Sequence, residues 1–109
     1  MPRSHDDLII SIEENGRTVA SAEVHPAGHP GVVHSDLHVE SGHVPGGTRT
    51  RLVDALLAHP RLDEAQRLLA TMPLGDTEML DRVRQRCLDV HAHAAGATKI
   101  VEARLVHSR

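Results

Sequence analysis

The 109-residue chain contains no phenylalanine, tyrosine or tryptophan, and this absence limits both its core and its chemistry. Its apolar 39% comes from aliphatic residues, methionine and one cysteine. A domain of this size buries only about two thirds of the surface that the unfolded chain exposes, so we expect a small aliphatic core. Base stacking on aromatic rings, aromatic cages for cations and tyrosine acid catalysis are all excluded.

Charge and cysteine content indicate where such a chain works. Lysine and arginine number 12 against 15 aspartate and glutamate, for a net charge of −3. We therefore expect no nucleic-acid partner and no anionic-membrane partner. Cys87 is the single cysteine, so no internal disulfide can form. The N-terminal residues lack a signal-peptide core and no apolar run is long enough to span a bilayer, so we expect a cytoplasmic protein.

Alternating hydrophobicity predicts three strands in the first half of the chain. Residues 8–13 and 17–25 flank Asn15-Gly16, a strong hairpin signal, and residues 32–40 follow a loop rich in proline and glycine. The residues expected to face inward are Leu8, Ile10 and Ile12, then Thr18, Ala20, Ala22 and Val24, and finally Val33, Ser35, Leu37 and Val39.

Helical spacing and capping residues predict two helices and two more strands in the second half. A first helix begins at Thr48 as N-cap, carries Leu52, Val53, Leu56 and Leu57 as an apolar stripe, and ends at Pro60. A strand is expected over residues 66–72. A second helix, capped by Asp76 or Thr77, is expected to run to Gly96 with Cys87, Leu88 and His91 on its stripe. A strand over 98–106 completes the chain.

These elements predict an α/β (α+β) fold with the order β-β-β-α-β-α-β. Three meandering strands precede two crossover units, so the sheet should be mixed, with two helices packed on it. We expect a single domain over residues 8–106, a disordered N-terminal tail over 1–7 and a C-terminal tail over 107–109.

The glycine-rich turn between the third strand and the first helix is the main candidate binding site. Free backbone N–H groups at a helix N-terminus attract anions, and glycine allows phosphate to approach the backbone. A small anionic ligand is therefore expected here, with charge-assisted contacts from the two arginines. The candidate binding residues are Gly46, Gly47, Thr48, Arg49 and Arg51.

Residues 37–57 resemble the GNAT-type N-acetyltransferase superfamily. Leu37 and Val39 match its strand pattern, Gly47 the first glycine of its pyrophosphate loop, and Leu52-Val53 the aliphatic pair of the following helix. The resemblance implies acetyl-CoA or CoA as cofactor, with Glu40 or His38 as the base that activates an amine. Some positions differ from the family pattern: Val44 replaces an Arg or Gln, Arg49 a Gly or Ala, and Ala92 the tyrosine acid. The one or two helices that usually separate the first two strands are also missing.

The ten histidines suggest metal binding, but their spacing does not complete a site. His34 and His38 are four residues apart on one strand, or about 13 Å, and cannot share an ion. Either could form half a site with Asp36, and the other ligands would have to come from another strand or subunit. We therefore predict no metal site from the sequence and expect solvated histidines on a polar sheet face.

Two functional hypotheses follow. The favoured hypothesis is a homodimeric interaction or small-ligand-binding module on a GNAT-like fold. Its catalytic site would be incomplete, so we expect no enzymatic activity and no cofactor. The alternative is a minimal acyl-CoA-dependent N-acyltransferase that uses the Gly46-Gly47 loop for pyrophosphate. One structural feature discriminates between them: a pantetheine arm needs the third and fourth strands to separate beside the loop.

Overall fold

The computed structural model describes residues 8–26, 28–42 and 44–107. The tail predicted over 1–7 lies outside the described residues, as do residues 108–109 of the predicted C-terminal tail. His107 is described, and its ring Nε2 lies 2.6 Å from the carbonyl oxygen of Ala65.

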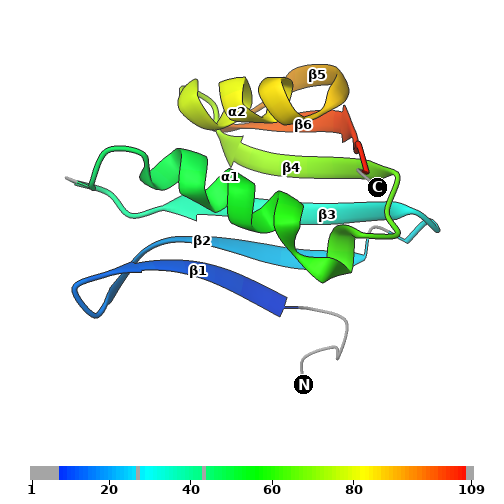
Figure 1. Ribbon diagram of the computed structural model, residues 1–109. Helices are drawn as coiled ribbons and strands as arrows, with labels where there is room; N and C mark the ends of the chain where they lie inside the picture. Colours follow the sequence, from blue (N-terminus) through cyan, green and yellow to red (C-terminus); the bar gives the residue numbers. More distant parts are fainter. Residues whose placement is uncertain (1–7, 27, 43, 108–109) are drawn as a thin grey trace, which may run out of the picture.

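Six strands form one mixed sheet and two helices pack on it (Figure 1), which confirms the predicted α+β class. The elements are β1 Leu8–Glu14, β2 Arg17–Pro26, β3 Val32–Val39, α1 Thr48–Ala58, the 3-10 turn η1 Pro60–Leu62, β4 Arg67–Pro73, α2 Glu78–Arg86, β5 Leu88–Ala95 and β6 Thr98–Arg104.

The strand order across the sheet is β1-β2-β3-β4-β6-β5. Every neighbouring pair is antiparallel except β3 and β4, which run parallel and are joined through α1. A parallel pair requires a long crossover, and α1 with its flanking loops supplies it. The loop into α1 therefore starts where β3 leaves the middle of the sheet.

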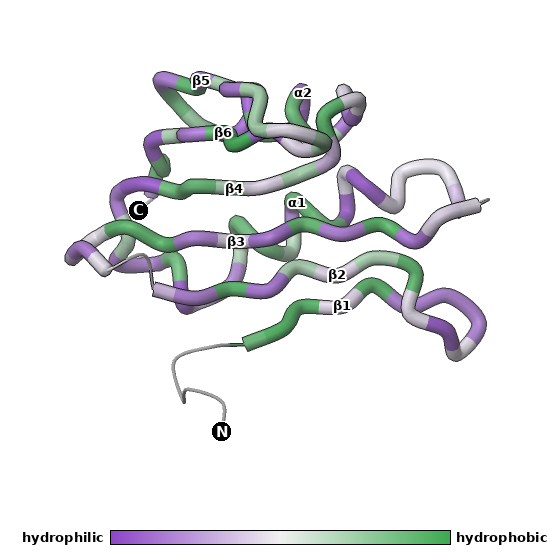
Figure 2. Tube along the Cα trace, turned by 180° about the vertical axis from the view of Figure 1, so that it is seen from behind, coloured by the Kyte–Doolittle hydropathy of each residue, from purple (hydrophilic) through white to green (hydrophobic). Residues whose placement is uncertain are grey.

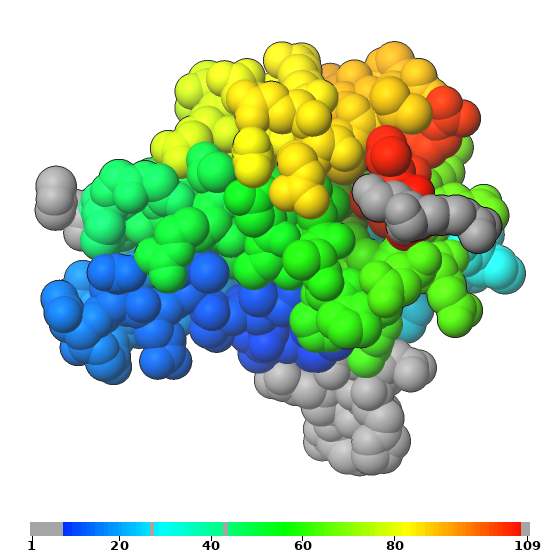
Figure 3. All heavy atoms as spheres, in the orientation of Figure 1, coloured from blue at the N-terminus to red at the C-terminus, as the bar shows by residue number. Residues whose placement is uncertain are grey.

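Both helices cover the same face of the sheet. Helix α1 contacts β1, β2 and α2, and in Figure 3 the two helices lie side by side over the strands. The core between helices and sheet is aliphatic, as the composition requires. Its strand residues include Ile12, Ala22, Val24, Val33, Leu37, Leu68, Ala70, Met72, Val101 and Ala103, and its helix residues include Leu52, Val53, Leu56, Met79 and Val83.

The register between β1 and β2 shifts near the hairpin, which corrects one predicted orientation. Ile12 pairs with Ala20 but Glu13 pairs with Thr18, so Val19 is an extra residue between the two pairs. Such a bulge turns the following side chain to the other face. Val19 is consequently buried and Thr18, predicted to face inward, is exposed.

The predicted second helix is too long, and the structure replaces its second half with a strand. Helix α2 ends at Arg86, and Cys87 adopts an extended conformation with φ −128° and ψ 170°. Residues 88–95 then form β5, which pairs with β6 through the turn at Gly96. Because nearly all of β5 is exposed, no hydrophobic periodicity marks it as a strand.

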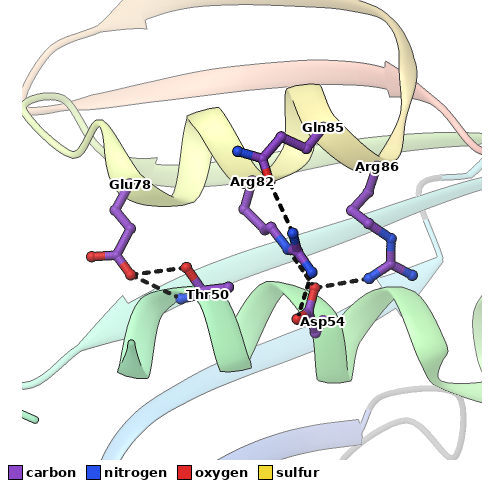
Figure 4. Close-up of polar contacts among 6 residues, drawn as sticks. All are labelled: Thr50, Asp54, Glu78, Arg82, Gln85 and Arg86. Carbon is purple, nitrogen blue, oxygen red and sulfur yellow. Dashed lines mark hydrogen bonds and ion pairs between the residues drawn. The ribbon is translucent and has the colours of Figure 1, made fainter. Parts of the chain in front are cut away.

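Charged side chains join the two helices (Figure 4). The Arg82 guanidinium makes two contacts with Asp54, at 2.7 and 3.0 Å, and Arg86 Nη1 lies 2.8 Å from Asp54 Oδ1. The hydrogen bond from Arg82 lowers the pKa of Asp54, and the charges of Arg82 and Arg86 act in the same direction. A two-point contact between guanidinium and carboxylate also restrains how the two helices lie against each other.

Within residues 8–26, 28–42 and 44–107 the other face of the sheet carries no helix, and Figure 2 views the strands from that side. Polar side chains from β2, β3, β4 and β6 alternate with the buried ones and point to this open face. Among the described residues, no helix is both long and apolar enough to cross a membrane.

Candidate functional site

The glycine-rich loop enters α1 through a left-handed residue. Gly47 has φ +83° and is the N-cap, one residue earlier than the Thr48 cap that the sequence predicts. Thr48 instead lies buried in the first turn, and its hydroxyl donates a 2.7 Å hydrogen bond to the carbonyl of Pro45. A positive φ favours glycine, which lacks the Cβ that would strain this conformation.

Several N–H groups at this helix start are available to a ligand. Within the described part of the chain, the N–H groups of Gly46, Gly47 and Arg49 donate no hydrogen bond. A Cβ added at Gly46 or Gly47 would meet no atom within 4 Å, so the backbone there is open to approach. Free N–H groups at the positive end of a helix suit an anion.

Backbone pairing between the two parallel strands in the middle of the sheet stops before the end of either strand. Their pairing starts at Val32 with Arg67 and ends at Asp36 with Thr71. Strand β3 nevertheless continues to Val39 and β4 to Pro73. The last residues of both strands therefore lie outside the shared ladder, at the end of the sheet where the chain turns into α1.

Both predicted anion-binding arginines are held by carboxylates. Arg49 Nε lies 2.7 Å from Oδ2 of Asp76, whose side chain is only 4% exposed. Arg51 Nη1 lies 2.8 Å from Glu14 Oε2 at the end of β1. Both guanidinium groups are therefore already paired, whereas the backbone N–H groups of Gly46 and Gly47 are not.

Glu78, from the first turn of α2, supplies the carboxylate that α1 lacks in its own first turn. Glu78 Oε2 accepts hydrogen bonds from the backbone N–H of Thr50 at 3.2 Å and from the Thr50 hydroxyl at 2.9 Å (Figure 4). A negative group at a helix N-terminus is stabilising. Sequence reasoning missed Glu78 in this role, because acidic residues at a helix start ordinarily serve their own helix.

The predicted catalytic pair, His38 and Glu40, lies at the end of β3. His38 Nε2 is 3.3 Å from Glu40 Oε2, and their side chains are 69% and 51% exposed. The backbone N–H of Glu40 donates a 2.9 Å hydrogen bond to the carbonyl of Val19, which anchors this end of the strand. Both residues follow Asp36, the last residue of β3 that pairs with β4.

No family model and no curated protein matches the chain. Several solved structures, however, have a similar fold. A ribosomal-protein-alanine N-acetyltransferase from Brucella melitensis superposes with a TM-score of 0.64 at 15% identity, over 92% of this chain and 68% of that protein. A putative acetyltransferase from Salmonella typhimurium, solved with its cofactor acetyl-CoA, gives 0.65 at 14% identity, over 94% and 66%. The GNAT domain of an S. lividans protein gives 0.64 at 15% identity, over 92% and 61%.

These likenesses are structural, because each identity is far below the level that would carry function. The chain spans roughly two thirds of the length of each of these three proteins. Nearly the whole chain takes part in each superposition, so the likeness is one of the overall fold. The chain therefore has a GNAT-like fold.

Proposed function

We propose that this chain is a small-ligand-binding module whose ligand is a coenzyme-A thioester or free CoA. The end of the β3–β4 ladder at Asp36 and Thr71, on the side of the sheet where the chain leaves for α1, is the observation that carries this proposal. A long pantetheine arm needs such a gap in the backbone pairing, and a pyrophosphate needs donors at its end. The loop N–H groups of Gly46 and Gly47 supply those donors.

In this proposal the backbone, rather than arginine, holds the pyrophosphate. Arg49 and Arg51 are engaged with Asp76 and Glu14, and moving either arginine would break a short ion pair. Backbone N–H groups need no such rearrangement. Affinity should therefore depend on the loop conformation and on the net charge around it more than on these two side chains.

A binding experiment with a charge placed in the loop tests this function. Isothermal titration with CoA and acetyl-CoA should give one site per chain, and saturating ligand should raise the melting temperature. Gly46→Glu should weaken binding at least about tenfold, because a carboxylate would face the phosphates. The glycine does not have a positive φ and a Cβ there is unobstructed, so the variant should fold.

Gln66→Glu is the matched control, since it adds the same charge at an exposed position at the other end of β4. It should bind CoA as the unmodified chain does. Absence of heat and of a thermal shift with both forms of the coenzyme would overturn the proposal. So would equal affinities for Gly46→Glu and Gln66→Glu.

Acyl transfer is the second candidate function, and the His38–Glu40 pair at the end of β3 favours it. Acetyl-CoA would supply an activated acetyl thioester. Glu40, or His38 supported by it, would take the proton from an attacking amine. Because the chain has no tyrosine, water would have to protonate the departing thiolate. We therefore rank binding above catalysis.

Release of free CoA thiol in the presence of polyamines or peptides tests the catalytic candidate. Glu40→Gln and His38→Gln should lower kcat while CoA affinity stays unchanged. If neither substitution changes turnover, neither Glu40 nor His38 is the base that deprotonates the amine. CoA binding without any thiol release would leave the chain as a binding module.

We further propose that the module self-associates through β5. This strand is at one edge of the sheet, and all its residues except the half-buried Val90 are exposed. Unpaired N–H and C=O groups on such an edge can pair with a second copy. Sedimentation velocity at two concentrations should show a dimer that Ala94→Lys weakens. An 11.8 kDa monomer at both concentrations would refute it.

A further inference from the structure

The open face of the sheet brings two histidines and an aspartate together from neighbouring strands. His25 on β2 pairs directly with His34 on β3, and Asp36 lies two residues further along β3 on the same face. Side chains directly opposite in adjacent strands lie close together. His34 and Asp36 are half of a metal site by their spacing on one strand, and the strand register adds His25 as a third residue.

The distances among the three side chains match the coordination of a small cation. His25 Nε2 lies 3.4 Å from Asp36 Oδ2, and His34 Nε2 lies 3.4 Å from Asp36 Oδ1. All three donor atoms lie within 4.8 Å of one another. Two ligands of a tetrahedral Zn²⁺ ion are separated by about 3.3 Å, so the aspartate spacings already fit and the two rings need only a small rotation.

The surroundings of the three residues favour an ordered site. The His25 and His34 side chains are 27% and 35% exposed, which restricts the rings while leaving a path for an ion. The Thr71 hydroxyl on β4 forms a 3.1 Å hydrogen bond with His34 Nε2, and once that nitrogen binds an ion the hydroxyl would be released to bond a water on the ion. Asp36 and Thr71 are also the last paired residues of β3 and β4.

We propose that His25, His34 and Asp36 bind one Zn²⁺ ion on the open face of the sheet, with water as its fourth ligand. Two imidazoles and one carboxylate form a donor set that suits Zn²⁺, and three protein ligands leave one position open to solvent. The ion would link β2 to β3 where the β3–β4 ladder ends. The site lies on the sheet face opposite the helices and does not depend on coenzyme binding.

Zinc titration of the untagged, chelator-treated chain tests the site. We expect one Zn²⁺ per chain in the micromolar range by calorimetry. Replacement by Co²⁺ should give the strong visible absorption of a tetrahedral complex. His34→Ala and Asp36→Asn should each lower zinc affinity at least about tenfold, because two remaining ligands hold an ion poorly.

His93→Ala is the matched control. His93 Nε2 lies 3.1 Å from Glu102 Oε2, so the two form a histidine–carboxylate pair without a third ligand in the described part of the chain. Its loss should leave zinc affinity unchanged. Circular dichroism without metal checks that each variant folds. If His34→Ala does not fold, Asp36→Asn still tests the site, because it keeps the size of the side chain.

Three results would overturn the proposal. One is the absence of zinc binding throughout the micromolar range. Another is an equal loss of affinity in His93→Ala and in the two site variants. The third is a weak, octahedral Co²⁺ spectrum, which would indicate loose binding by scattered surface groups.

Discussion

Arg49 on α1 and Asp76, which precedes α2, form a short ion pair in which Nε and Oδ2 are 2.7 Å apart. Asp76 also accepts the backbone N–H of Met79 at 2.9 Å, so the same carboxylate caps α2. The buried Lys99 on β6 donates a hydrogen bond to the Asp76 carbonyl. One residue thus connects both helices and the sheet beside the proposed coenzyme loop.

Replacing Asp76 should destabilise the fold. Asp76→Ala leaves the Arg49 guanidinium without its partner and removes the cap of α2, for a loss of about 2 kcal/mol in the free energy of unfolding. Urea denaturation followed by circular dichroism measures this loss. Asp63→Ala, at an exposed position, is the control and should change stability by less than about 0.5 kcal/mol. Equal stabilities for the two variants would contradict the assigned role.

The Asp54 contacts with Arg82 and Arg86 predict a stability difference that depends on pH. These arginines lower the pKa of Asp54 in the folded protein, so the unfolded chain takes up the proton first as the pH falls. The resulting stabilisation is present at neutral pH and is lost below about pH 4.

Asp54→Asn tests this dependence. It should be less stable than the unmodified chain at pH 7, and the difference should shrink as the pH falls below about 4. Thermal melts at several pH values measure both stabilities. Because the contact is partly exposed, the difference at pH 7 should be no more than about 1 kcal/mol. A difference that is constant with pH would contradict the role of the carboxylate charge.

Glu78 should oppose the anion that we propose for the loop. Its carboxylate lies at the N-terminus of α1, where it accepts from Thr50, and it would repel a nearby phosphate. Glu78→Gln keeps an acceptor and removes the charge. We expect CoA to bind severalfold more tightly to this variant in titration calorimetry at low salt, with the gain disappearing at high salt. Tighter binding that persists at high salt would contradict the electrostatic explanation.

Cys87 should be a slow nucleophile in the folded protein. Its side chain is buried after the end of α2, and burial raises the pKa of its thiol. The thiolate that reacts with Ellman's reagent is therefore scarce near neutral pH. Labelling should be slow in native buffer and fast in urea. Rapid native labelling would place the thiol at the surface.

The strand patterns show what local sequence can predict. In β3 one side of the strand is buried against the helices, so hydrophobicity alternates and the predicted inward residues Val33, Ser35 and Leu37 are correct. Strand β5 lacks such a side. Its alternating histidine and alanine residues are exposed on both faces, and alanine favours a helix, so the sequence predicts a longer α2.

The candidate binding loop was predictable and its ion pairs were not. The sequence Gly46-Gly47 before an amphipathic segment indicates a turn into a helix, because local backbone conformation depends on the glycines themselves. The partners of Arg49 and Arg51 lie 27 and 37 residues away along the chain. No local sequence pattern relates either arginine to its partner. The ion pairs of Arg49 with Asp76 and of Arg51 with Glu14 are therefore evident only in the folded chain.

By itself the sequence determined the hairpin at Asn15-Gly16, the faces of most strands and the position of the loop. Each of these depends on residues close together in the chain. Tertiary structure alone decided that the pairing of β3 with β4 ends at Asp36 and Thr71, and that His25 lies opposite His34. Strand order and register arise from packing of distant segments, and they decide which side chains meet.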